Sequence, residues 1–299
     1  MSNSFSRRIR NQGIAFAMTD VLAMTGVYIF SKIFLNDLPF PVFGVYWFSA
    51  GLIWNLILSF FVPGTYSKFE IKGSYLVFLV VVGILDMAAT ILWFEAVDKT
   101  DNPSLVSFMT NISPVYAVIL GYVFLKERLS LSEGIGIIVT LAGAVLIGYR
   151  NDFTLNSFLF SGAGIILISS LISQGGKVIL KTRIRNYHPI VLSINRIVFL
   201  LLFSFSFVFI FDYSLNIGSE MIVYIAIGAL MGPVISAFAG YNALARLKVS
   251  TWSILSTSRS FFVMLVSYLI LNNLPDTIQI AGGLLTVAGV VVISLARVK

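Results

Sequence analysis

Residues 111–130 read NISPVYAVILGYVFLKERLS, an apolar run of helical length with a proline near its start and three charges at residues 126–128. In a water-soluble helix Pro114 would remove a backbone hydrogen bond and clash with the preceding turn, at a cost of about 3 kcal/mol. A lipid bilayer tolerates such a proline, because neighbouring helices, hydroxyl groups and water satisfy the freed carbonyl group. The stretch therefore predicts a membrane-spanning helix that bends at Pro114 and leaves the hydrocarbon at the charges.

The composition of the whole chain agrees with this interpretation. Hydrophobic residues make up 58% of the 299 residues, charged residues 11%, and the mean hydropathy is +0.95. A water-soluble globular domain carries about 25% charged residues. The chain has no cysteine, and its single histidine, His188, precedes Pro189 in a predicted loop. Disulfides, thiolate metal sites and histidine-based metal or catalytic sites are excluded, and we expect neither a metal nor a cofactor.

Ten apolar segments are long enough to be membrane spans, each needing about 20 residues. We predict an all-α integral membrane protein with ten transmembrane helices, at residues 13–34, 41–62, 74–97, 104–125, 132–149, 157–180, 190–211, 220–245, 251–271 and 277–296.

The basic residues indicate the orientation of these spans. If the N-terminus is cytoplasmic, fourteen bases fall on the cytoplasmic side: Arg7, Arg8, Arg10, Lys68, Lys72, Lys126, Arg128, Lys181, Arg183, Arg185, Arg246, Lys248, Arg297 and Lys299. The other side holds only Lys32, Lys99 and Arg150. This asymmetry follows the positive-inside rule and predicts a cell-membrane protein with both termini in the cytoplasm. Because the bases are scattered over short loops, they do not indicate a nucleic-acid partner.

The chain also repeats itself. FEAVDK at 94–99 is similar to YNALAR at 241–246, and GIIVTLAGAVLI at 136–147 is similar to GGLLTVAGVVVI at 282–293. Lys32 matches Lys181 in the same way. We predict two repeats, at residues 1–150 and 151–299. Each holds five spans, an odd number, so the two repeats are inverted relative to each other, an architecture of secondary transporters with a site at the repeat interface.

The segment SPVYAVILGYVFLKERLSLSEGIGIIVTLAGAVLIG at 113–148 resembles the second half of an EamA-type repeat of the drug/metabolite transporter superfamily. The resemblance covers nearly the whole chain, twice. This sequence departs from the family pattern at Ser113, where glutamate is frequent, and at Lys126, where glycine is usual. The matching segment of the second repeat, SRSFFVMLVSYLILNNLP, has Arg259 in place of the proline.

The resemblance implies ten helices, five plus five, around a central cavity that opens alternately to the two sides of the membrane. Members of the family mostly export amino acids, other small metabolites or drugs, and some take up metabolites. The resemblance does not define the substrate.

Five charged residues lie away from the ends of the predicted spans: Asp20, Asp86, Lys177, Arg196 and Arg259. Such groups are costly in a membrane and usually face a wet cavity or pair with one another. In one interpretation the carboxylates pair permanently with the arginines and lock the repeats together. In the other, an arginine is free in one conformation and binds the carboxylate or phosphate of a substrate, which suits its planar fork.

Further polar and aromatic residues near these charges are candidates for the same site. The candidate substrate-binding residues are Arg259, Arg196, Asp86, Asp20, Gln174, Lys177, Trp54, Tyr241 and Asn242. The candidate proton carriers are Asp20, Asp86 and Glu95. We expect hinges at Pro114, Gly175 and Gly176, with the sixth span interrupted at the two glycines. Three tryptophans near predicted span ends indicate an interfacial belt: Trp47, Trp93 and Trp252.

A row of small residues at four-residue spacing, Gly136, Thr140, Ala144 and Gly148, allows close helix packing within the fold or at a homodimer seam. No ATP-binding motif of the P-loop type is present. The leading hypothesis is a secondary transporter that exports small polar metabolites such as amino acids. Efflux of lipophilic cations and uptake or exchange of a nucleotide-like or sulfonium metabolite are the alternatives, and an intramembrane enzyme or a scaffold subunit is a more distant one.

Overall fold

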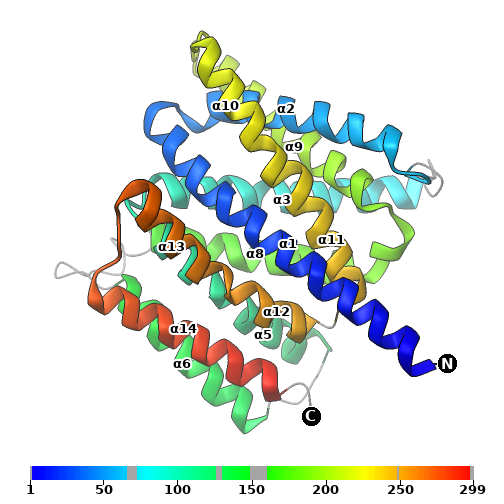
Figure 1. Ribbon diagram of the computed structural model, residues 1–299, viewed down its shortest axis with the longest axis vertical. Helices are drawn as coiled ribbons and strands as arrows, with labels where there is room; N and C mark the ends of the chain where they lie inside the picture. The colour runs from blue at the N-terminus through cyan, green and yellow to red at the C-terminus, as the bar shows by residue number, and fades with distance from the viewer. Residues whose placement is uncertain (1, 66–72, 126–129, 149–159, 248, 297–299) are drawn as a thin grey trace.

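The computed structural model describes residues 2–65, 73–125, 130–148, 160–247 and 249–296, and these residues form helices joined by short connections, without β-strands. The helices run roughly side by side across the molecule (Figure 1). The predicted all-α fold is therefore confirmed. The charges of residues 126–128, which the sequence placed at a span end, lie outside the described residues.

In the first half of the chain the helices are α1 (Ser2–Asp37), α2 (Phe40–Phe61), α3 (Gly73–Asp98), α4 (Pro103–Met109), the 3-10 turn η1 (Thr110–Ile112), α5 (Ser113–Leu125) and α6 (Leu131–Gly148). In the second half they are α8 (Gly162–Arg183), the 3-10 turn η2 (Ile184–Asn186), α9 (Pro189–Ile210), α10 (Ser219–Ala229), the π-helical η3 (Leu230–Ser236), α11 (Ala237–Arg246), α12 (Val249–Thr257), α13 (Arg259–Leu271) and α14 (Thr277–Ala296).

Several helices begin where proline follows a capping residue. The Asn102 side chain accepts a hydrogen bond from the Ser104 amide at the start of α4, and Pro103 occupies the first turn. His188 caps α9 in the same way, with its Nδ1 atom accepting from the Ile190 amide. Proline is favourable here because the amides of a first turn have no partner within the helix. The single histidine is thus a helix cap.

Eight helical stretches among the described residues are long and apolar enough to cross a membrane. The fifth and ninth predicted spans correspond to shorter apolar helices, Leu131–Ile147 and Leu255–Leu271. Many large apolar side chains face outward, including Phe60 at 85% and Phe209 at 81% exposure. An apolar surface of this kind is expected where lipid replaces water.

Two predicted spans are broken within their length. The fourth consists of α4, η1 and α5, with Pro114 in the first turn of α5. The hinge expected at Pro114 stays a prediction. The ninth consists of α12 and α13, separated at Ser258, although it contains no proline. The sixth predicted span is not interrupted, because α8 continues through Gly175 and Gly176. The expected interruption at these glycines is wrong, because a glycine inside a helix costs only about 1 kcal/mol relative to alanine and need not break the helix.

The most extensive helix packing joins the two halves of the chain: α6 with α14, α3 with α8, α2 with α9, and α1 with α11. The row of small residues on α6 is used in this packing. A Cβ atom on Gly136 would lie 2.8 Å from the Gly289 carbonyl oxygen, and one on Gly289 would lie 2.6 Å from the Thr140 amide nitrogen. The row therefore serves contact with α14 inside the fold.

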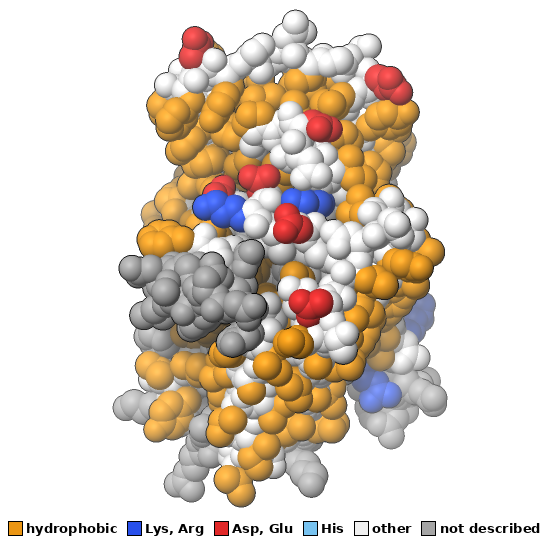
Figure 2. Space-filling view, turned by 90° about the vertical axis from the view of Figure 1, so that its left-hand side faces the viewer, with side chains coloured by type: hydrophobic (Ala, Val, Ile, Leu, Met, Phe, Trp, Pro, Cys, Tyr) orange, Lys and Arg blue, Asp and Glu red, His pale blue; other side chains and the backbone are white. Residues whose placement is uncertain are grey.

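The start of α1 and the end of α14 lie on the same side of the helix bundle (Figure 1). Exposed basic side chains near helix ends on that side include Arg8, Arg183, Arg185 and Arg246. Figure 2 shows the opposite end, over which acidic side chains are scattered. Exposed acids in the connections on that end are Asp37, Asp101, Asp212 and Asp276.

Candidate functional site

A central cavity of ≈ 260 Å³ lies between the halves. Its walls come from α1, α2, α3 and the broken fourth span in the first half, and from α8, α9, η3, α11, α12 and α13 in the second. The five ionisable residues predicted within spans all line it, together with two tyrosines: Asp20, Asp86, Lys177, Arg196, Arg259, Tyr28 and Tyr241. The tertiary structure thus gathers charges from five different helices around one space.

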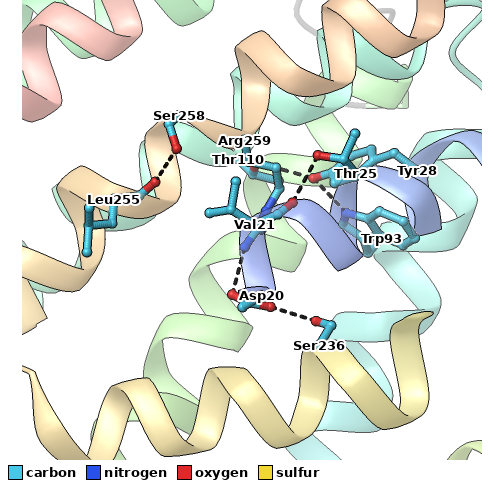
Figure 3. Close-up of polar contacts among 10 residues, drawn as sticks. All are labelled: Asp20, Val21, Thr25, Tyr28, Trp93, Thr110, Ser236, Leu255, Ser258 and Arg259. Carbon is cyan, nitrogen blue, oxygen red and sulfur yellow. Dashed lines mark hydrogen bonds and ion pairs between the residues drawn. The ribbon is translucent and has the colours of Figure 1, made fainter. Parts of the chain in front are cut away.

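The first charged group is an ion pair between the halves. Arg259 Nη2 on α13 lies 3.0 Å from Asp20 Oδ2 on α1, and the Ser236 hydroxyl donates a hydrogen bond of 2.6 Å to the other carboxylate oxygen (Figure 3). The side chains are only 16% and 7% exposed. A paired and hydrogen-bonded carboxylate is stable at such a position, whereas removing one partner leaves a buried charge.

The second charged group is arranged differently. Arg196 Nη2 donates a 3.0 Å hydrogen bond to the Thr90 hydroxyl and makes no ion pair with any described residue. Tyr241 donates from its hydroxyl to Asp86 Oδ2 at 3.4 Å, and Asp86 also lies within electrostatic range of Arg196 and Lys177. Of the two arginines, one is fixed by a carboxylate and the other has a neutral partner.

Lys177 extends from α8 towards α12, where its Nζ atom lies 4.8 Å from the centre of the Trp252 ring. This is a cation–π contact. Gln174, one turn earlier on α8, is buried and also lines the cavity.

A polar and aromatic cluster at another part of the wall was not predicted. Trp93 Nε1 donates to the Tyr28 hydroxyl at 3.2 Å, and that hydroxyl lies 3.4 Å from the Thr110 hydroxyl oxygen (Figure 3). The internal match that pairs Lys32 with Lys181 also pairs Tyr28 with Lys177. That symmetry was the one signal in the sequence that pointed to Tyr28.

The tryptophans do not take the positions predicted for them. Trp47, Trp93 and Trp252, expected at the membrane interface, all line the cavity. Trp54, expected in the cavity, instead donates from its indole nitrogen to the Ala226 carbonyl oxygen at 3.0 Å between α2 and α10. Position along a helix gives depth but not the direction in which the side chain points, and this explains the errors.

Four other candidates lie outside the cavity wall: Asn242, Glu95, Gly175 and Gly176. Asn242 is buried against its own helix, where its side chain donates to the Phe238 carbonyl and accepts from Arg246. Glu95 is paired with Lys99 at 3.1 Å, and both are more than 40% exposed. Gly175 has open space where a Cβ atom would lie, whereas one on Gly176 would be 3.4 Å from Leu85 on α3.

The comparisons with known proteins agree with this architecture. The model of the EamA-like transporter family matches the chain twice, at residues 11–149 and 160–295. The chain belongs to the EamA-like transporter family. Its resemblance to that family, inferred above from residues 113–148, is thereby confirmed, and the chain is a multi-pass membrane protein.

Two of the relatives of this EamA-like protein are named as transporters, without a substrate. An uncharacterized transporter of Bacillus subtilis, YdfC, is 23% identical over 249 residues, which cover 80% of this chain and 78% of the relative. An uncharacterized transporter of Synechocystis, sll1164, is 22% identical and covers 74% of this chain and 66% of its own. A WAT1-related protein of Arabidopsis thaliana is 30% identical over 115 residues, 36% of this chain and 33% of the relative.

A solved crystal structure has the same fold as this EamA-like chain. Its TM-score is 0.69 at 18% sequence identity, and the superposition covers 95% of this chain and 96% of the other. At this level of identity the likeness concerns the fold alone. The protein is therefore a transporter by family, and the roles of its cavity residues depend on their own geometry.

Proposed function

We propose that the protein is a secondary active transporter that moves small, polar, carboxylate-bearing metabolites such as amino acids by alternating access, in the direction of export. The observation that carries the proposal is the cavity between the halves, in which Arg196 donates to a hydroxyl group and makes no ion pair with a described residue. A guanidinium group binds a carboxylate through two parallel hydrogen bonds. The volume of the cavity, ≈ 260 Å³, suits a small metabolite.

We assign the fold ten transmembrane helices in two inverted five-helix repeats, residues 1–150 and 151–299. The interhalf packing supports this assignment. Under an exchange of the repeats, the pair α1 with α11 becomes α8 with α3, and both pairs occur. The pairs α2 with α9 and α6 with α14 are each converted into themselves. This pattern is expected of two similar units around a twofold axis in the membrane plane.

The proposed location is the cytoplasmic membrane of the cell, and the proposed orientation places both termini in the cytoplasm. Support comes from the exposed arginines on the side of the termini and the exposed acids on the other side. The cytoplasmic side of a membrane protein carries the excess of lysine and arginine. The partners that we propose are the bilayer and a small-molecule substrate, and a homodimer is a further hypothesis.

The ion pair between Asp20 and Arg259 gives a means of alternating access. It joins α1 of the first half to α13 of the second at a distance of 3.0 Å. A movement of one half against the other would separate these residues, so the pair favours the conformation described here. Energy comes from the substrate gradient or from protons, with Asp20 and Asp86 as the proposed carboxylate carriers. Glu95 is the weakest of the three candidates because it is paired with Lys99 outside the cavity.

The test is transport by purified protein in proteoliposomes loaded with a labelled panel of amino acids, lipophilic cations and nucleotides. We expect flux of a carboxylate-bearing solute, and loss of at least tenfold in flux for Arg196→Ala. The matched control is Arg185→Ala, an exposed arginine on the connection after α8. Flux of cations alone, or of nucleotides alone, would favour one of the alternatives, and counterflow in vesicles of known orientation tests export against uptake.

A further inference from the structure

Lys177 differs from every other charged residue that lines the cavity. Asp20 and Arg259 pair with each other, Asp86 accepts from Tyr241, and Arg196 donates to Thr90. The Lys177 ammonium group has no hydrogen bond and no ion pair with a described residue; its contact is the face of the Trp252 ring. An ammonium group carries three donors and strongly prefers acceptors.

A count of charges shows why this matters. The ionisable groups of opposite sign on the cavity wall are the carboxylates of Asp20 and Asp86 and the guanidinium groups of Arg196 and Arg259, and these cancel. Lys177 adds one positive charge. Uncompensated charge within a low-dielectric environment is costly. The cavity therefore favours either a ligand with a net charge of −1 or a neutral lysine.

Donors on the opposite wall also lack acceptors. Trp252 Nε1, the Ser256 hydroxyl and Arg259 Nε are buried and have no hydrogen-bond partner among the described residues. All three residues line the cavity. Trp252 and Ser256 are four residues apart on α12 and therefore lie on one face of that helix, and Arg259 follows across the break at Ser258. Lys177 contacts Trp252 from α8. Together they form a set of donors suited to an acceptor-rich, anionic group.

The chemistry of the cations decides which of them can respond to the ligand. Arginine keeps its proton in proteins, whereas a lysine in a protein interior can lose its proton. The charged and titratable groups that face Lys177 from the surrounding helices are Asp20, Asp86, Arg196 and Arg259, with Tyr241 bonded to Asp86. Entry of an anion adds a negative charge beside these groups, and the effect on protonation is largest at Lys177, which has no hydrogen bond or ion pair with a described residue.

We propose that Lys177 takes up a proton from water when a monoanionic ligand enters the cavity and releases that proton when the ligand leaves, so that one proton moves with each anion. This inference rests on the proposed transport function and extends it to the charge of the substrate. In this inference the residue that carries the coupling proton is Lys177 instead of Asp20 or Asp86. In the empty cavity part of the lysine population is a neutral amine, and in the loaded cavity the lysine is an ammonium group bound to the anion.

The test is isothermal titration calorimetry of full-length protein in lipid nanodiscs, at pH 6, 7 and 8, in buffers of different ionisation enthalpy. The probes are matched pairs that differ in one charge: glutamate and glutamine, aspartate and asparagine, benzoate and benzamide. We expect at least one anion to bind, its neutral partner to bind at least tenfold more weakly, and the anion to bring up to one proton with it. Its affinity should fall with rising pH, by up to about tenfold per pH unit, the limit for one linked proton.

Variants separate a titrating lysine from a merely structural one. Lys177→Arg should keep anion binding but lose proton uptake and the fall with pH, because arginine stays charged. Lys177→Met should weaken anion binding at least tenfold at every pH. The control, Lys99→Met, changes an exposed lysine outside the cavity and should retain proton uptake.

Any of four outcomes would overturn the inference. The wild type could bind an anion without proton uptake, or proton uptake could persist in Lys177→Arg. The neutral partners could bind as tightly as the anions, or none of the three anions could bind. These outcomes are distinct from failure of transport. Flux of a neutral solute without protons would support the transporter proposal and contradict proton uptake by Lys177. Proton-linked anion binding in nanodiscs without flux of any solute in proteoliposomes would do the reverse.

Discussion

The fourth and ninth predicted spans are equivalent segments of the two repeats, and each is broken at the same place by different means. In the fourth, a 3-10 turn precedes Pro114; in the ninth, Ser258 separates α12 from α13 and Arg259 stands at the position of the proline. The two breaks touch, because Asn111 Nδ2 donates to the Ser260 hydroxyl at 3.2 Å. A proline accounts for one break only, so the break is a property of the packing around it.

The two breaks also differ in polarity. Around the first, hydroxyl and amide groups are satisfied within the protein: Thr110 donates to the Ser107 carbonyl at 2.6 Å and Asn111 to Ser260. Around the second lie a guanidinium group and several donors without protein acceptors. The first break therefore satisfies its polar groups within the protein, whereas the second leaves buried donors without acceptors at the cavity wall.

The largest effect should come from the charged break. Arg259→Ala leaves the Asp20 carboxylate buried with only the Ser236 hydroxyl, which should lower the free energy of unfolding by about 3–5 kcal/mol and abolish transport. The measurements are thermal unfolding in detergent and flux in proteoliposomes. The double variant Asp20→Asn with Arg259→Gln should recover much of the stability but not the transport. Full flux in the double variant would show that the pair is structural alone.

A smaller effect is expected at the contact between the breaks. Asn111→Ala removes the hydrogen bond to the buried Ser260 hydroxyl and should lower the free energy of unfolding by about 1–3 kcal/mol. The measurement is the same unfolding transition, with transport per folded molecule retained within about twofold. Selective loss of transport at unchanged stability would place Asn111 in the ligand site and weaken the distinction between the breaks.

The smallest effect is expected at the proline itself. Pro114→Ala should lower the free energy of unfolding by only about 0.4–1 kcal/mol, mainly through the greater freedom of the unfolded chain. Because the ninth span breaks without proline, the fourth should keep its break, insert normally and transport more slowly. Unchanged transport kinetics in proteoliposomes would contradict the hinge assigned to Pro114, and loss of insertion would contradict a break imposed by packing.

Much of the candidate site was predictable because ionisable residues are rare within apolar segments. Asp20, Asp86, Lys177, Arg196 and Arg259 were recognisable from the sequence, and all five line one cavity. Their partners were not recognisable. Arg259 pairs with Asp20, which is 239 positions away in the chain, and Arg196 donates to Thr90, which is 106 positions away. No local pattern encodes such a choice.

The aromatic residues show the limit most clearly. Hydropathy located the spans that contain Trp47, Trp54, Trp93 and Trp252, but it did not show that Trp54 alone among them lies away from the cavity wall. A tryptophan near a span end suits both a lipid interface and a tapering cavity, and the rotation of the helix about its axis decides between them. That rotation is set by neighbours from the other half of the chain.

By itself the sequence determined that the protein is a helical membrane protein of the EamA-like family, where its apolar segments lie, and which ionic side chains fall inside them. These are properties of composition, run length and internal repetition, which short-range physics fixes. Only the tertiary structure decided that a span without proline is broken, that one arginine is paired while the other has a neutral partner, and that Lys177 faces a ring instead of a carboxylate. Each of these depends on how two distant helices meet, and that is settled by packing over the whole fold.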